Sequence, residues 1–198
     1  MDTDDRRTVL VTGAAQGLGL QMTTAFLRDG CRVAMADRNE GELARAAAPL
    51  LEEHADGAVT ALPVDVTDDA SVQQMVDGVQ AWAGRLDVLV NNAGVISRSP
   101  SEAMPTEVWL RELDVNVGGT FRCSRAAFPL LRASAYPSII NLGSLGSSLG
   151  MPMRVAYNTS KTGIVGLTRT LAAEWGALGI RVNAIAPGFI EKIGRAHV

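Results

Sequence analysis

Tyr157 and Lys161 stand four residues apart in a segment with a helical pattern. On a helix this spacing puts both side chains on one face. A phenol ionises with a pKa of about 10, and a neighbouring ammonium stabilises the phenolate and lowers that pKa. The pair could therefore accept a proton from an alcohol or return one to a ketone. The spacing alone is weak evidence, because such pairs also occur as plain helix-surface contacts.

A glycine-rich turn, residues 12–19 (TGAAQGLG), follows the first apolar run of the chain. Gly13 suits a turn conformation, Gly17 lets the backbone approach a pyrophosphate, and Gly19 lets the next helix pack close to a sheet. The helix start would offer free N–H groups and the positive end of a dipole to phosphates. The turn therefore favours dinucleotide binding over the alternative of a purely structural loop.

Asp37 ends the second apolar run, close to the offset of about 20 residues at which an acidic side chain binds a ribose 2′-hydroxyl. A carboxylate there would repel a 2′-phosphate, so NAD is favoured over NADP. Arg38 could compensate for a phosphate, but Ala15 and Gln16 supply no cation. The alternative is that Asp37 merely caps the following helix.

Short apolar, β-branched runs alternate with longer helical patterns along the chain. We predict strands at 8–12, 32–36, 58–64, 86–91, 138–142 and 180–186. We predict helices at 17–29, 40–54, 68–82, 106–132 and 156–178. This alternation indicates an α/β fold: a Rossmann-type, doubly wound parallel sheet in one domain, with helices on both faces. Ligands of such folds bind beyond the carboxyl ends of the strands, where the motifs of this chain fall.

The sequence resembles the short-chain dehydrogenase/reductase family from about residue 8 to residue 191. Single motifs such as Tyr-x-x-x-Lys are common by chance, but the ordered set is specific. The motifs are the glycine turn at Thr12–Gly19, Asp65-Val66, Asn91-Asn92-Ala93-Gly94, Asn116, Ser144, Tyr157-x-x-x-Lys161 and Pro187-Gly188.

The resemblance implies a catalytic set of Asn116, Ser144, Tyr157 and Lys161. Tyr157 would exchange the proton, Lys161 would tune it and hold the nicotinamide ribose, and Ser144 would donate to the substrate oxygen. Asn116 would hold a water that links Lys161 to solvent, although a structural role for it in the helix is an alternative. The implied cofactor-binding residues are Gly13, Gln16, Gly17, Leu18, Gly19, Asp37, Arg38, Asp65, Val66, Asn92, Ala93, Gly94, Tyr157, Lys161, Pro187 and Gly188.

We therefore expect an NAD-dependent oxidoreductase that interconverts a secondary alcohol and a ketone, similar to sugar, polyol or 3-oxoacyl reductases. One alternative is an NADPH-dependent reductase of 3-oxoacyl thioesters, against which Asp37 argues. A second alternative is an NAD-binding regulator without turnover, against which the complete catalytic set argues. The segment 143–154 suits polyols, sugars, steroids or cyclic alcohols, so the small-molecule substrate stays open.

The composition excludes several other classes. The chain has 198 residues, 47% hydrophobic and 20% charged, with a net charge of −3, so neither nucleic acid nor anionic lipid is an expected partner. It shows no secretion signal and no uncharged apolar run of about 18 residues, so we expect no membrane segment and a cytoplasmic protein. Cys31 and Cys123 read as free thiols, and the two histidines lie in no ligand cluster, so no metal is expected.

The two longest predicted helices, 106–132 and 156–178, resemble those through which the family forms homodimers or homotetramers. The chain departs from the family after Glu191. We expect a catalytic domain at 1–191 that lacks its last strand, which would leave 180–186 as an exposed edge. We expect residues 192–198 (KIGRAHV) to be a non-natural tail translated from a sequencing adapter, with a genuine short form as the alternative. Such a chain would be poorly soluble and weakly active or inactive.

Overall fold

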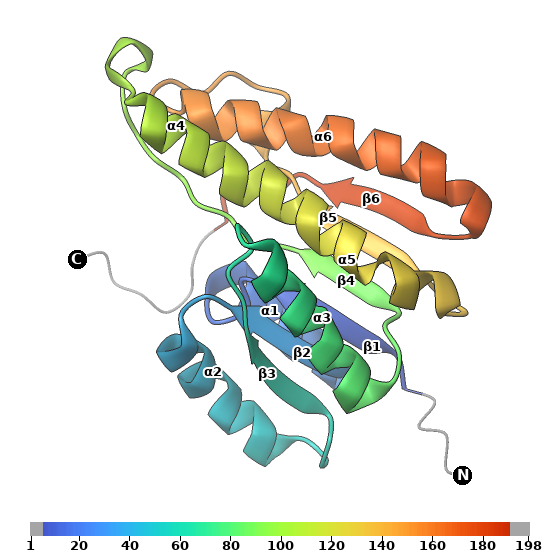
Figure 1. Cartoon of the computed structure of the whole chain (residues 1–198). Helices are drawn as coiled ribbons and strands as arrows, with labels where there is room; N and C mark the ends of the chain where they lie inside the picture. The colour runs from blue at the N-terminus through green and yellow to red at the C-terminus, as the bar shows by residue number, and fades with distance from the viewer. Residues whose placement is uncertain (1–5, 191–198) are drawn as a thin grey trace.

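The computed structural model describes residues 6–190, and its centre is a single parallel sheet of six strands (Figure 1). Their order across the sheet is β3-β2-β1-β4-β5-β6, so the chain winds outward from β1 and then returns to β4 on its other side. The point of reversal lies between β1 and β4, where ligands of doubly wound sheets bind. The strands are β1 (Thr8–Thr12), β2 (Arg32–Asp37), β3 (Val59–Pro63), β4 (Val88–Asn91), β5 (Ser138–Leu142) and β6 (Arg181–Ile185).

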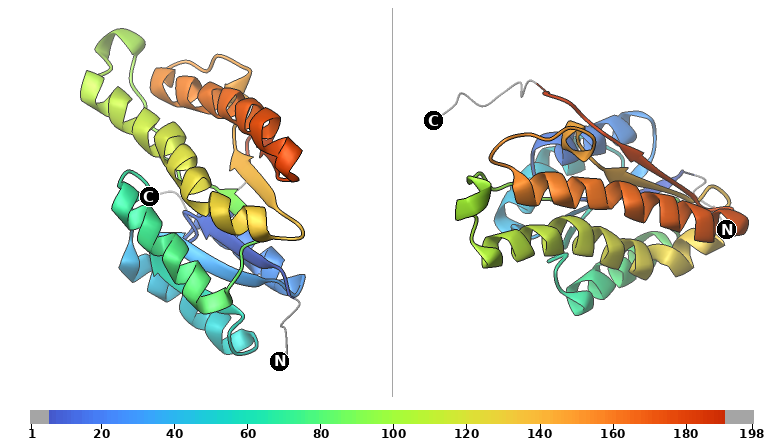
Figure 2. Two further views of the ribbon diagram at one scale, coloured as in Figure 1. Left: turned by 45° about the vertical axis from the view of Figure 1, so that its right-hand side comes forward. Right: turned by 90° about the horizontal axis from the view of Figure 1, so that it is seen from above.

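Helices cover both faces of the sheet (Figure 2). One face carries α1 (Gly17–Arg28) and α2 (Glu40–Glu53). The other carries α3 (Asp69–Ala83), α4 (Thr106–Leu113), α5 (Gly119–Ala133) and α6 (Val155–Trp175), and α4–α5 runs beside α6. Short helical turns complete the fold: η1 (Ser101–Ala103), the π-helical η2 (Asp114–Gly118), η3 (Leu145–Ser147) and η4 (Gly176–Leu178).

Two apolar cores lie on opposite faces because side chains alternate along each strand. In β1, Val9 and Val11 pack with Leu27 under α1, whereas Leu10 packs with the residues under α3 and α5. All five residues of β1 are buried, which explains its continuous apolar run. The prediction of a parallel sheet with two covered faces is confirmed.

The predicted helix at 106–132 is wrong in one respect: a π-helical turn at Asp114–Gly118 separates α4 from α5. A π turn inserts one extra residue and changes the phase of the helix, which a regular 3.6-residue pattern does not indicate. The other predicted elements are confirmed, with ends that differ by at most three residues; the largest difference is at the end of α6, where Gly176–Leu178 form the separate turn η4.

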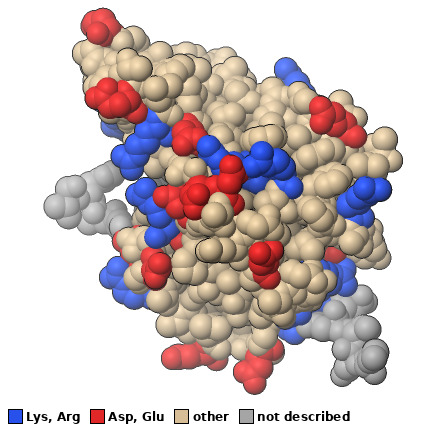
Figure 3. Space-filling model, in the orientation of Figure 1, with Lys and Arg blue, Asp and Glu red and all other residues tan. Residues whose placement is uncertain are grey.

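Ion pairs join the helices of the α3–α6 face. Arg122 of α5 pairs with Asp114 of η2 at 2.7 Å, and Arg125 pairs with Asp69 at the start of α3. Figure 3 shows acidic and basic side chains gathered in the middle of this face. Exposed pairs of this kind contribute little stability, so packing holds the layer together.

Strand β6 lies at the edge of the sheet, as expected. The predicted tail at 192–198 lies outside the described residues. Within residues 6–190, no helix is long and apolar enough to cross a membrane. Cys123 is buried and free, and burial raises the pKa of its thiol to about 12, while Cys31 is half-buried.

Candidate active site

The glycine turn after β1 is fixed by backbone contacts. Gly13 and Gly17 have φ values of +66° and +57°, a region that favours glycine. A Cβ on Gly19 would lie 2.1 Å from the Gly13 carbonyl oxygen, so no side chain fits at position 19. A Cβ on Gly17 would meet nothing within 4 Å. The turn is therefore tightly packed at Gly19 and open at Gly17.

Asn92, directly after β4, clamps this turn. Its side-chain Nδ2 donates to the carbonyls of Thr12 and Gly13 at 2.9 and 3.0 Å. In return, the Thr12 hydroxyl oxygen accepts from the backbone N–H groups of Asn92 and Ala93, both at 3.1 Å. The Asn92 side chain thus shapes the predicted phosphate site through the turn.

Asp37 lies beside the glycine turn at the end of β2. One carboxylate oxygen accepts from the Ala15 N–H at 3.2 Å, and the other accepts from the Asn39 N–H at 3.0 Å. The cap of α2 is Asn39, whose side chain accepts from Glu42 at 3.1 Å. The alternative in which Asp37 caps the helix is therefore wrong, and Asp37 instead connects the turn to β2.

Asp65 and Val66 follow β3 on the same side. Hydrogen bonds from the side chain and backbone of Thr67 hold the pKa of the Asp65 carboxyl below its usual value. The positive charge of Arg38, which is exposed, acts in the same direction. Val66 is buried against Gly119 of α5, where an added Cβ would lie 2.7 Å from the valine side chain.

Ser144 begins the turn η3 after β5. Its hydroxyl oxygen accepts from the Gly146 N–H at 3.1 Å, and its own N–H donates to the Ser147 hydroxyl at 3.1 Å. Ser147 in turn donates to the Lys161 carbonyl at 2.8 Å, which ties η3 to α6. Since the Ser144 oxygen already accepts one bond, its proton is available for another acceptor.

Lys161 of α6 is buried, with 6% of its surface exposed. Its Nζ donates to the Leu142 carbonyl at 2.6 Å and lies 5.7 Å from the centre of the Tyr157 ring. Burial lowers the pKa of Lys161 to about 8, and the negative charge of Glu112 partly opposes this. Tyr157 is half-buried on the same face of the helix.

Asn116 lies in the π turn, and its amide is fully engaged. It accepts from the Val95 N–H at 2.8 Å and donates to the Val95 carbonyl and the Ser160 hydroxyl at 3.0 and 2.9 Å. The Ser160 hydroxyl in turn donates a hydrogen bond to the Tyr157 carbonyl at 2.8 Å. A Cβ on Gly94 would lie 3.1 Å from Asn116 Oδ1 and 3.6 Å from Lys161 Nζ, so all three groups meet at one place.

Pro187 and Gly188 run beside η3, because the Leu145 N–H donates to the Pro187 carbonyl at 2.9 Å. Gln16 and Leu18 are exposed on the glycine turn. The structure thus brings the predicted residues together at the carboxyl end of the sheet. The glycine turn and Asp37 lie toward β2, and Ser144, Tyr157 and Lys161 lie toward β5 and α6.

A buried polar network under the site was missed by sequence reasoning. Asn91 Nδ2 donates to Ser124 at 3.0 Å and to Asn141 Oδ1 at 2.9 Å, and Asn141 donates to Thr168 at 2.9 Å. The network ties β4 and β5 to α5 and α6 beneath Lys161. The available signal was an asparagine in each of two mainly apolar strands, since buried polar groups need partners.

The family model for short chain dehydrogenase matches residues 7–195. The chain therefore belongs to the short-chain dehydrogenase family, whose members bind a nicotinamide cofactor, and it is an oxidoreductase acting on CH–OH groups.

The chain is 39% identical over 183 residues to the D-threitol dehydrogenase of Mycolicibacterium smegmatis, covering 92% of this chain and 70% of that protein. It is 36% identical over 185 residues to the 3-oxoacyl-[acyl-carrier-protein] reductase FabG of Thermotoga maritima, covering 92% and 73%. The crystal structure of gox2181 superposes with a TM-score of 0.88 at 38% identity, covering 94% of this chain and 73% of that one.

Proposed function

We propose that this protein transfers a hydride between NAD(H) and a secondary alcohol or ketone, with Tyr157 as general acid/base. The supporting observation is the buried Lys161 ammonium beside the Tyr157 ring, at the same end of the sheet as Ser144. When bound, the nicotinamide supplies the acceptor or donor of the hydride. The protein's own task is to move the proton of the alcohol oxygen.

The glycine turn fits a dinucleotide. Gly19 packs so tightly that the helix start approaches the turn, whereas Gly17 leaves open space above the backbone. A pyrophosphate could approach there and meet the N–H groups of the first turn of α1. Asp65 and Val66 would border the adenine, and Ala93, Gly94, Pro187 and Gly188 would border the nicotinamide.

Four side chains would bind the alcohol, move its proton or support the residues that do so. Ser144 would donate its free hydroxyl proton to the substrate oxygen, and Tyr157 would take the proton of the alcohol as the C–H bond breaks. The Lys161 ammonium would stabilise the phenolate and hold the ribose. Asn116 would fix the loop at Val95 and, in the π turn, border the path from Lys161 to solvent.

We infer NAD rather than NADP because the Asp37 carboxylate lies at the end of β2, where a ribose 2′-phosphate would be repelled. Asp37→Asn keeps a hydrogen-bond acceptor for the Ala15 N–H and removes the charge. Fluorescence titration should show NADH binding at least about tenfold tighter than NADPH, and Asp37→Asn should narrow that preference. Equal affinities in the unchanged protein would contradict the inference.

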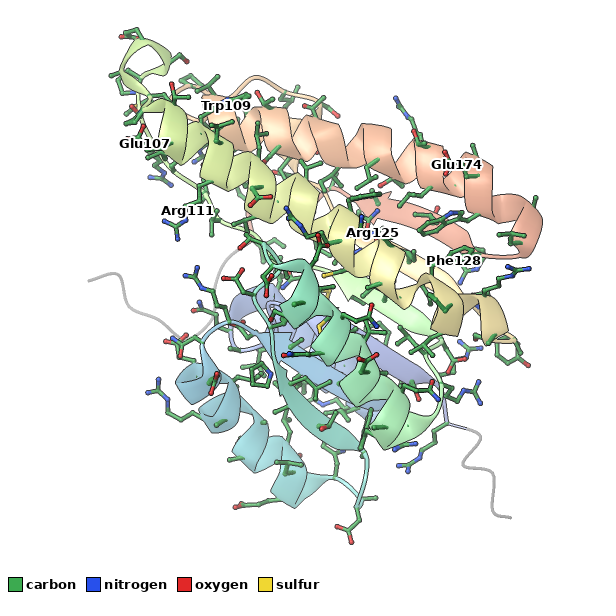
Figure 4. The ribbon with its side chains drawn as sticks, viewed as in Figure 1. Glu107, Trp109, Arg111, Arg125, Phe128 and Glu174 are labelled. Atoms are coloured by element: carbon green, nitrogen blue, oxygen red, sulfur yellow. The ribbon has the colours of Figure 1, made fainter. Side chains whose placement is uncertain are left out.

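The α4–α5 and α6 surface supports a homodimer or homotetramer. Figure 4 labels Glu107, Trp109 and Arg111 on α4, Arg125 and Phe128 on α5, and Glu174 on α6. Leu110 and Phe121 are 53% and 41% exposed on the α4–α5 segment, and they would become buried between copies. Sedimentation velocity of the full chain tests this, and a monomer at high concentration would contradict it.

The activity is tested by following NADH formation from NAD with D-threitol, cyclohexanol and a 3β-hydroxysteroid. The matching arm follows NADPH consumption with a 3-oxoacyl thioester, which the similarity to FabG makes the second candidate. NAD-linked oxidation of one alcohol is expected. Preferred use of NADPH and the thioester would favour the reductase, and NADH binding without any turnover would favour a regulator.

A further inference from the structure

The loop after β4 is tied to the helix below it at two points. Asn116 holds both backbone groups of Val95, and one helical turn earlier Glu112 of α4 holds Ser97. Glu112 Oε2 accepts from the Ser97 N–H at 3.0 Å and from the Ser97 hydroxyl. One carboxylate oxygen of Glu112 thus holds both polar groups of Ser97.

Glu112 is unusual in its burial. Its exposed fraction is 1%, and its second oxygen, Oε1, is buried with no hydrogen-bond partner among residues 6–190. A buried carboxylate oxygen without a partner is costly unless another charge compensates for it. Helix α4 packs against α6, which carries the buried Lys161 ammonium.

We propose that Glu112 is a positioning residue, which fixes the loop at Ser97 and supplies the buried negative charge that keeps the Lys161 ammonium stable beside Tyr157. The catalytic meaning of this role rests on the proposed function. Asn116 Oδ1 lies beside the same glycine as Lys161 Nζ, and Glu112 holds the same loop two residues further along, at Ser97. The proposed interaction between Glu112 and Lys161 is therefore a Coulomb attraction across a distance and not a direct ion pair.

The other charged groups on the elements around Lys161 are exposed or contact other residues, and Arg98, beside Ser97 on the loop, is exposed. Glu107 and Arg111 on α4, Arg181 on β6, and Arg169 and Glu174 on α6 itself are exposed. Asp114 of η2 pairs with Arg122, and Arg154 at the start of α6 contacts the Met151 sulfur. Strand β5 and the turns η3 and η4 carry no charged residue. Among residues 6–190, it is the negative charge of Glu112 that opposes the lowering of the Lys161 pKa by burial.

The sequence offers a direct measurement, because Lys161 and Lys192 are its two lysines. Protein labelled with 13C at the lysine Cε gives two signals, and Lys192→Arg identifies the one from Lys161. An NMR titration of the full chain then reports the Lys161 pKa without any turnover. Glu112→Gln keeps an acceptor for Ser97 and removes the charge, so the midpoint should fall by about one unit.

Two variants separate the effects of charge and of loop attachment. Glu107→Gln, an exposed glutamate on the same helix, should leave the Lys161 midpoint unchanged. Ser97→Ala keeps the Glu112 charge, so it should also leave the midpoint near that of the unchanged protein, but it should speed amide exchange at residues 95–99 several-fold. In turnover, Glu112→Gln should move the alkaline limb of the kcat profile to lower pH.

The proposal is overturned if Glu112→Gln and Glu107→Gln give the same Lys161 midpoint. Should Glu112→Gln fail to fold, the carboxyl signal of Glu112 in the unchanged protein decides, because a carboxyl still protonated at pH 8 supplies no charge. A shifted Lys161 midpoint in a protein without dehydrogenase activity would sink the proposed function and leave the charge pairing intact.

Discussion

Around β1 and β2 the candidate site is built from backbone, whereas around β5 and α6 it is built from buried side chains. The glycine turn is shaped by positive φ values and by contacts too close for a Cβ. The other half depends on Lys161, Ser144 and an asparagine network under the sheet. The first half should therefore be sensitive to added atoms, and the second to removed charge or hydroxyl groups.

The largest expected effect is in the side-chain half. Tyr157→Phe removes the proton acceptor and keeps the ring, so kcat should fall by about a thousandfold or more. The affinity for NADH should change by no more than about threefold, because the backbone half is untouched. Steady-state rates and fluorescence titration measure the two quantities, and an unchanged rate would remove Tyr157 from the mechanism.

The backbone half is challenged by two matched substitutions. Gly19→Ala places a Cβ against the Gly13 carbonyl and should reduce the free energy of unfolding by about 3 kcal/mol. Gly17→Ala meets open space and should cost only about 1 kcal/mol for its positive φ, yet weaken NADH binding at least about tenfold. Denaturant unfolding and NADH titration test both, and equal losses of stability would contradict the packing argument.

In the part of the site around β5 and α6, the buried Lys161 ammonium should lower the free energy of unfolding. The pKa of Lys161 falls from its usual 10.5 to about 8 on folding, so below pH 8 the full cost of the buried ammonium is present. Between pH 8 and 10.5 the folded protein binds fewer protons than the unfolded chain, and this contribution to the free energy of unfolding rises with pH. Lys161→Met should therefore stabilise the protein at pH 7 by up to about 3 kcal/mol.

The gain in the free energy of unfolding from Lys161→Met should vanish towards pH 10.5. Urea unfolding at several pH values measures it, and Arg169→Met, an exposed cation on the same helix, is the control. A Lys161→Met advantage that does not change with pH would show that packing, not charge, is responsible.

The smallest expected effect concerns Asn92, whose side chain connects the end of β4 to the glycine turn. Asn92→Ala removes two hydrogen bonds to the glycine turn and should reduce the free energy of unfolding by about 1 to 2 kcal/mol. Asn183→Ala on the exposed edge strand is the matched control and should change it by less than about 0.5 kcal/mol. Equal losses for the two variants would mean that the clamp contributes nothing.

Local patterns predicted much of this molecule. The apolar strands, the glycine turn and the Tyr157–Lys161 spacing are each visible within a short stretch of sequence. The alternation of such strands with helical patterns was enough to predict the fold class and most of the elements. Interactions between distant segments were not visible. Asn92 meets Thr12 across 80 residues, and Asp37 meets Ala15 across 22. Glu112 reads as one more charged residue on a helix, and its burial depends on how α4 packs against α6.

The π turn at Asp114–Gly118 sets the angle at which α4 presents its side chains. Five residues of a π turn rotate the chain by about the same angle as four residues of an α-helix, so the turn absorbs one extra residue between α4 and α5. Glu112 can therefore face Ser97 while Cys123 and Leu131 lie against the sheet. Deleting one residue inside the turn should leave both contacts in place, because the two helices keep nearly the same orientation.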